Sequence, residues 1–213
     1  MILIRPLLTE NVDSFPTFSV DISNTSEYLC VGLVDMVNST KISAKLPQKK
    51  AARYYEIFLN SMAKVLCKYY GVVIKNIGDS LLFYFPGSNS KQQNFLNCLE
   101  CSLAMIDEHQ KIKEILAKEE LPAADYRISL DYGYISIMKS TTNSFDVIGT
   151  PVNMCAKINR QASVNGIIIG GDLYRMVKNF DEHYMKQAFW FSIGLDKTYP
   201  IYSVRRKISR KAQ

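Results

Sequence analysis

The sequence predicts an α+β protein with a ferredoxin-like split βαβ core and added strands near the C-terminus. Short apolar runs alternate with two long amphipathic segments in the order β-α-β-β-α-β, which is typical of that core. The middle of this pattern is a pair of apolar runs interrupted at residues 76–78, a hairpin signal. A chain of 213 residues is long enough to bury the core of one such domain.

The first half of the pattern begins with a strand at residues 28–36, which is apolar until it reaches Asp35. A helix is expected over residues 49–71, where large apolar side chains recur every three or four positions and Gly71 ends the run. These side chains are Tyr54, Phe58, Met62, Val65 and Tyr69. The hairpin spans residues 72–85, and a long helix is expected over residues 90–118.

The second half begins with a strand at residues 126–140, followed by a turn and a short strand at residues 145–149. The remaining predicted elements are a helix at 150–163, a strand at 166–170, a small helix at 172–179 and a closing strand pair near 187–204. We find no internal repeat and no low-complexity segment.

Composition narrows the class of protein. The net charge of +6 is concentrated in the tail at 205–213 and near residues 45–50, and no nucleic-acid-binding signature accompanies it, so we expect no nucleic-acid partner. No apolar run reaches membrane-spanning length, and the N-terminus resembles neither a secretory signal nor a transit peptide. The five cysteines are an odd number, and the Cys98–Cys101 pair has no metal-binding partner motif. We therefore expect packed, reduced thiols and a cytoplasmic location.

Two aspartates lie at the ends of apolar strands. Asp35 closes the first strand, and Asp79 follows Gly78 in the central hairpin. The simplest alternative for Asp35 is a cap on the next helix. In a split βαβ sheet, however, the first strand and the hairpin are neighbours, so the two carboxylates converge. Paired carboxylates with open positions suit two Mg²⁺ ions engaged in phosphoryl chemistry.

Four motifs in the same order and spacing resemble the catalytic domain of class III nucleotidyl cyclases. They are "DMVNST" from Asp35, "KNIGD" from Lys75, "RISLDYG" at 127–133 and "DVIGTPVNMCAK" from Asp146. The resemblance covers about residues 28–204, leaving 1–27 as a leader or linker and 205–213 as a basic tail. It implies the class III cyclase fold and the formation of 3′,5′-cyclic nucleotides from nucleoside triphosphates.

The resemblance also implies roles. Asp35, the backbone carbonyl of Met36 and Asp79 are expected to hold two Mg²⁺ or Mn²⁺ ions per site, and Asn38, Ser39 and Thr40 to contact the substrate. Lys75 and Asp146 form the pair that reads the base. A donor and an acceptor there match adenine N1 and its amino group, which favours ATP over GTP.

Asn153 resembles the residue that orients the ribose, and Lys157 stands where the family has an arginine for the transferring phosphate. Lysine keeps the charge but lacks the bidentate fork of arginine. Arg160 is a nearby substitute, and Lys197 is a stand-in for a phosphate-binding lysine near the C-terminus. Three interpretations remain open: an adenylate cyclase acting in signal transduction, a cyclase for guanine or a pyrimidine, and a non-catalytic nucleotide-binding homologue.

Assembly follows from the four-residue separation of Lys75 and Asp79. One of them is expected to meet the base and the other a metal at the opposite end of the nucleotide. The two residues therefore serve different active sites, which requires a head-to-tail homodimer, as the resemblance also implies.

Overall fold

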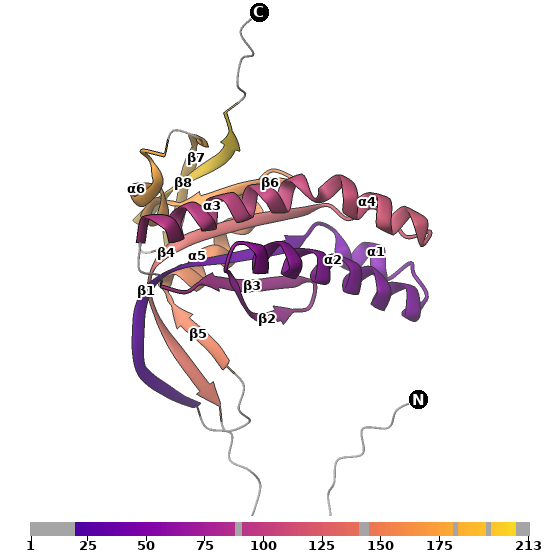
Figure 1. Ribbon diagram of the computed structural model, residues 1–213, viewed down its shortest axis with the longest axis horizontal. Helices are drawn as coiled ribbons and strands as arrows, with labels where there is room; N and C mark the ends of the chain where they lie inside the picture. The colour runs from indigo at the N-terminus through magenta and orange to yellow at the C-terminus, as the bar shows by residue number, and fades with distance from the viewer. Residues whose placement is uncertain (1–19, 88–90, 141–144, 181–182, 195–196, 208–213) are drawn as a thin grey trace, which may run out of the picture.

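A single mixed sheet forms the centre of the molecule, with helices on both of its faces (Figure 1). The computed structural model of the chain describes residues 20–87, 91–140, 145–180, 183–194 and 197–207. The strand order is β2-β3-β1-β4-β6-β8-β7, and β5 pairs with β4 beside this path. The α+β fold with a split βαβ core and added C-terminal strands is confirmed.

Eight strands of the described residues make up the sheet. They are β1 (Val20–Met36), β2 (Val72–Ile77), β3 (Ser80–Phe85), β4 (Tyr126–Ser140), β5 (Phe145–Gly149), β6 (Gly166–Gly170), β7 (His183–Gly194) and β8 (Lys197–Arg206). The central strands β1 and β4 are antiparallel, and β4 and β6 are the parallel pair. The predicted limits of β4, β5 and β6 agree with the structure.

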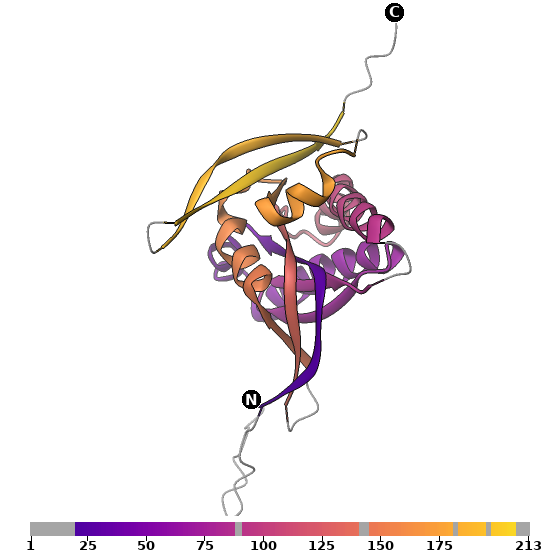
Figure 2. The same cartoon turned by 90° about the vertical axis from the view of Figure 1, so that its left-hand side faces the viewer.

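The helices divide between the two faces. The helices are α1 (Ser39–Ser43), α2 (Gln48–Lys68), α3 (Lys91–Asp107), α4 (His109–Lys118), α5 (Thr150–Ile158), the 3-10 turn η1 (Asn159–Gln161) and α6 (Gly171–Val177). Helices α2, α3 and α4 bury the larger core against one face, and Tyr54, Phe58 and Met62 of α2 are fully buried there. Figure 2 shows α5 on the opposite side of the central strands from α3. Burial of this apolar surface is the main source of stability for the layers.

Several expectations about element limits were wrong, including the helix expected over 150–163, which ends at Ile158 and is followed by the 3-10 turn η1. The first strand begins at Val20 rather than at 28, because its polar first segment pairs by backbone with the far end of β4, from Val20 opposite Ser140. The helix expected over 90–118 is interrupted at Glu108, although the hydrogen bond from the Glu108 amide to the Ala104 carbonyl continues the helical path. Residues 1–19 of the predicted leader and 208–213 of the predicted tail lie outside the described residues.

All five cysteines are free, and four of them are buried, including Cys98 and Cys101 on α3. Among the described residues, no helix is long and apolar enough to cross a membrane.

Candidate active site

Asp35 lies at the C-terminal end of β1, on the face of the sheet that carries α5. Side chains alternate along a strand, and Val31 and Leu33 pack in the smaller apolar cluster with Cys155 of α5. Asp35 continues this alternation to the edge of the cluster. Directly opposite on β3 stands Ser80, whose hydroxyl donates a hydrogen bond to the Asp35 carboxylate. The apolar strand therefore ends in a carboxylate held in a fixed orientation.

Asp79 lies in the turn between β2 and β3. Gly78 takes a positive φ of 62°, a conformation that glycine adopts without steric cost, and it allows the tight turn that the sequence predicted. The Asp79 carboxylate accepts a hydrogen bond from the hydroxyl of Ser39, the buried first residue of α1. Asn38, at the N-cap of α1, also has a left-handed backbone. The segment after β1 and the β2–β3 turn are thus joined through Ser39 and Asp79.

Burial and neighbouring charges affect the ionisation of Asp35. Burial raises the pKa of Asp35 above its ordinary value, and the negative charge of Asp79 raises it further. The hydrogen bond from Ser80 and the positive charges of Arg127 and Arg160 act in the opposite direction. Because the raising causes prevail, an ionised Asp35 is a destabilised anion in the free protein.

This donor set fits a divalent cation. A desolvated carboxylate beside a second carboxylate is stabilised by a bound cation, and hard oxygen ligands are those that Mg²⁺ prefers. Met36 follows Asp35 on β1, and its side chain is buried, so it offers only its backbone carbonyl. No cluster of three or more His, Cys, Asp or Glu side chains occurs among the described residues. A metal held here would therefore keep open positions for water or phosphate.

Lys75 and Asp146 form a second cluster. The Lys75 ammonium makes an ion pair with the Asp146 carboxylate, which joins β2 to β5. The second Asp146 oxygen accepts a hydrogen bond from the Val147 amide at 2.8 Å. Both side chains are partly exposed, at 40% and 29%. The sequence placed these residues together, and the structure brings their side chains into contact.

Helix α5 presents the remaining predicted residues. Asn153 and Lys157 are four positions apart and both are exposed, whereas Met154, Cys155 and Ile158 pack into the domain. Residues separated by one helical turn share a face, so Asn153 and Lys157 lie side by side on the outer surface. Thr40 is exposed on α1, and Lys197 is the first residue of β8.

The sequence motifs did not assign a role to Arg127. It stands opposite Asp35 in the register of β1 and β4, and its charge lowers the pKa of that carboxyl. Its buried Nε has no hydrogen-bond partner within the described part of the chain. A buried donor left unpaired beside a carboxylate is suited to an anionic ligand bound with a cation. In the sequence, the signal for a role of Arg127 was its position at the start of the motif "RISLDYG".

The comparisons with known proteins agree with this architecture. The description "Adenylate and Guanylate cyclase catalytic domain" matches residues 22–193. The chain therefore belongs to the class III nucleotidyl cyclase family. It is 18% identical to the solved adenylyl cyclase CyaB from P. aeruginosa, with a TM-score of 0.77 over 87% of this chain and 97% of that one.

Curated relatives differ in the base they use. One is a cytidylate cyclase of Staphylococcus aureus, 23% identical over 176 residues, or 78% of this chain and 42% of that protein. Another is an adenylate cyclase of Streptomyces coelicolor, 21% identical over 141 residues, or 66% of this chain and 32% of that protein. The chain spans less than half the length of these two relatives.

Proposed function

We propose that this protein is an adenylate cyclase that converts ATP to 3′,5′-cyclic AMP and pyrophosphate. The ion pair between Lys75 and Asp146 carries the proposal, because it holds one donor and one acceptor side by side in two partly exposed side chains. Adenine offers the complementary pattern, an acceptor at N1 and a donor at its amino group. Guanine and uracil offer a ring N–H donor beside a carbonyl acceptor, which this pair does not match in the same orientation.

The residues around Asp35 supply the other half of the site. Asp35, Asp79 and the Met36 carbonyl would hold two Mg²⁺ or Mn²⁺ ions, and Asn38, Ser39 and Thr40 would line the approach of the triphosphate. When bound, the ions would lower the pKa of the ribose 3′-hydroxyl and neutralise charge on the phosphates. Arg127, whose Nε lacks a partner among the described residues, would donate to a phosphate oxygen.

The exposed face of α5 acts on the sugar and the reacting phosphate. Asn153 would orient the ribose by hydrogen bonding, so that the 3′-oxygen lies in line with the α-phosphorus. Lys157 would stabilise the charge that develops on the transferring phosphate. In this reaction the protein forms no covalent bond, and its contribution is positioning and charge stabilisation.

We further propose that the active unit is a cytoplasmic head-to-tail homodimer. Each chain contains two distinct clusters, one around Asp35 and Asp79 and one around Lys75 and Asp146. Each site would take its metal ligands from one chain and its base readers from the other. The five free cysteines are consistent with a reducing compartment.

A substrate panel tests the proposal. Purified protein is incubated with Mn²⁺ or Mg²⁺ and, separately, ATP, CTP, GTP and UTP, and the products are separated by chromatography. We expect cyclic AMP as the main product. Cyclic GMP as the main product would overturn the assignment of the Lys75–Asp146 pair, and no cyclic product from any triphosphate would favour a non-catalytic nucleotide-binding homologue.

Cytidine triphosphate is the second candidate substrate. Cytosine presents an amino donor beside a ring-nitrogen acceptor, so it matches a lysine and an aspartate in the same way as adenine does. The similarity to the cytidylate cyclase of Staphylococcus aureus supports the same alternative. A kcat/KM for CTP above that for ATP would select this candidate without changing the roles of the residues.

Replacement of Lys157 by arginine is expected to maintain or raise turnover. Lys157 lies on the exposed face of α5. A guanidinium forms bidentate hydrogen bonds with phosphate, whereas an ammonium acts as a point charge. Steady-state kinetics of Lys157→Arg and Lys157→Ala measure the effect, with Ala expected to be strongly impaired. A collapse of activity in the arginine variant would show that lysine itself is required.

A further inference from the structure

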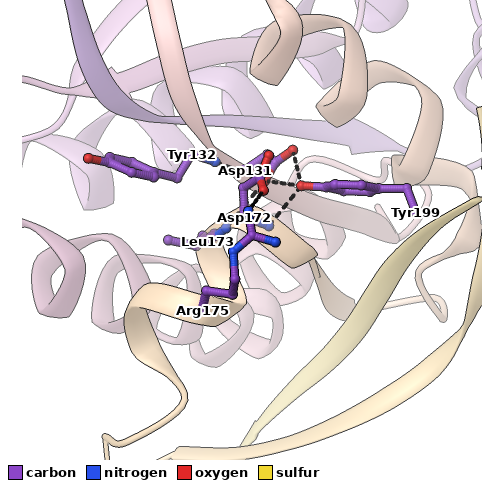
Figure 3. A network of polar contacts seen from close by, with 6 residues as sticks. All are labelled: Asp131, Tyr132, Asp172, Leu173, Arg175 and Tyr199. Carbon is purple, nitrogen blue, oxygen red and sulfur yellow. Dashed lines mark hydrogen bonds and ion pairs between the residues drawn. The ribbon is translucent and has the colours of Figure 1, made fainter.

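Asp131 is a buried carboxyl group that the proposed reaction does not use. It lies in the middle of β4 and is only 1% exposed. Three groups donate to it: the Tyr132 amide at 2.9 Å, the Leu173 amide at 3.4 Å, and the Tyr199 hydroxyl, whose oxygen is 3.0 Å from each carboxylate oxygen. Figure 3 shows Asp131 between Tyr199 and the start of α6. This carboxyl group therefore joins β4, β8 and α6.

Tyr199 lies just beyond the point at which β8 stops pairing with β6. Pairing between β6 and β8 stops at Gly170 and Ile201. Beyond that point, residues 197–200 of β8 pair only with residues 190–194 of β7 among the described strands. We call these two segments the distal ribbon; in Figure 2, β7 is the light-orange strand and β8 the yellow strand at the top. The Tyr199 side chain is thus placed to fix the distal ribbon to the domain.

The backbone around this contact is packed closely. A Cβ at Gly170 would lie 2.4 Å from Oδ1 of Asp131, and a Cβ at Gly171 would lie 2.7 Å from the Pro200 ring. The Tyr199 oxygen also accepts a hydrogen bond of 2.8 Å from the Asp172 amide. The glycines therefore make room for a specific arrangement of Asp131 and Tyr199 against α6.

We propose that Asp131 is a positioning residue whose protonation determines how firmly Tyr199 holds the distal ribbon against the domain. Within the described part of the chain Oδ2 receives no backbone donor, so it is the oxygen that would carry the proton. A protonated Asp131 can donate from Oδ2 to Tyr199 while Oδ1 accepts from it. An ionised Asp131 can only accept, and it leaves a charge in the interior.

The pKa of Asp131 places the change in its protonation near neutral pH. Burial raises the pKa of Asp131 to about 7, with the charge of Asp172 adding to the effect and the hydrogen bonds opposing it. Because this pKa lies above that of an unfolded aspartate, protonation stabilises the folded state. The contribution of Asp131 is fully present below about pH 4 and is lost as the pH rises to about 7.

Other ionisable groups also lie around Asp131. Asp172 of α6 is paired with Arg175, and burial keeps the pKa of the Cys155 thiol on α5 well above its usual value. Burial also raises the pKa of Tyr199 on β8. His183 is the first residue of β7, at the other end of that strand from the distal ribbon, and its imidazole requires a control variant.

The chain has a built-in probe of the ribbon. Trp190 is the only tryptophan in the sequence, is 60% exposed, and pairs across the ribbon with Pro200, the neighbour of Tyr199. In the full-length protein, Trp190 emission and acrylamide quenching are followed from pH 5.5 to 8.5. The amide resonances of Asp172 and Leu173 are followed by NMR in the same samples. We expect both signals of the wild type to change with a midpoint near pH 7.

Two variants and one control test which residue causes the pH-dependent transition. Asp131→Asn retains an acceptor and a donor for Tyr199, so it should show no transition and keep the low-pH quenching of the wild type. Tyr199→Phe keeps the apolar packing but removes the hydroxyl, so quenching should be high and constant across the range. His183→Gln should retain the transition. An unchanged transition in Asp131→Asn or Tyr199→Phe, or its loss in His183→Gln, would overturn the inference, as would a wild type without a transition.

Discussion

Alanine at Asp35 or Asp79 is expected to reduce cyclic nucleotide formation by roughly a thousandfold, equivalent to about 4 kcal/mol of transition-state stabilisation. The two carboxylates are the acidic groups of their cluster, and each is oriented by one serine hydroxyl. Removal of either leaves a two-metal site without one of its charged ligands. Initial rates with saturating metal and triphosphate measure the loss.

The stability of the folded state is not expected to fall with the activity. Burial and the neighbouring Asp79 raise the pKa of Asp35, so its ionised form costs stability at neutral pH. The Asp35→Ala variant is therefore expected to have a Tm equal to or above that of the wild type. Asp107→Ala, at an exposed aspartate of α3, is the matched control and should retain full activity. Near-normal turnover in Asp35→Ala, or a large fall in its Tm, would contradict the assignment.

The fold was largely predictable because its strands carry clear local signals. Residues 126–140 and 145–149 are bounded by turn residues, and their limits were predicted as the structure has them. The first part of β1 has no such signal. Its residues 20–27 are mostly polar and become a strand through backbone pairing with β4, a long-range contact that local patterning does not reveal.

The candidate site was likewise predictable only in part from the sequence. The convergence of Asp35 with Asp79 and of Lys75 with Asp146 was expected from motif spacing and element order. Ser80 as the partner of Asp35, and Arg127 opposite the same aspartate, depend on strand register. A shift of one residue would turn these side chains to the other face, so their roles follow only from the paired strands.

The proposal that each active site is shared between two chains predicts a second large effect on activity. Lys75→Ala and Asp35→Ala should each be nearly inactive as homodimers, because every site in either variant lacks one essential group. In a mixed dimer, one site combines the intact Asp35 and Asp79 of one chain with the intact Lys75 and Asp146 of the other. The second site of that dimer carries both defects.

Mixing the two inactive variants is therefore expected to restore activity. Random exchange makes about half of the dimers mixed, each with one intact site of two, so about a quarter of wild-type turnover should return. Subunit exchange is promoted by dilution and reconcentration and is verified with differently tagged chains. Mixing Asp35→Ala with Asp79→Ala is the matched control. Both changes affect the same cluster, so each mixed dimer lacks a metal ligand in every site and stays inactive. Verified exchange of Lys75→Ala with Asp35→Ala without recovery would mean that each chain builds its own complete site.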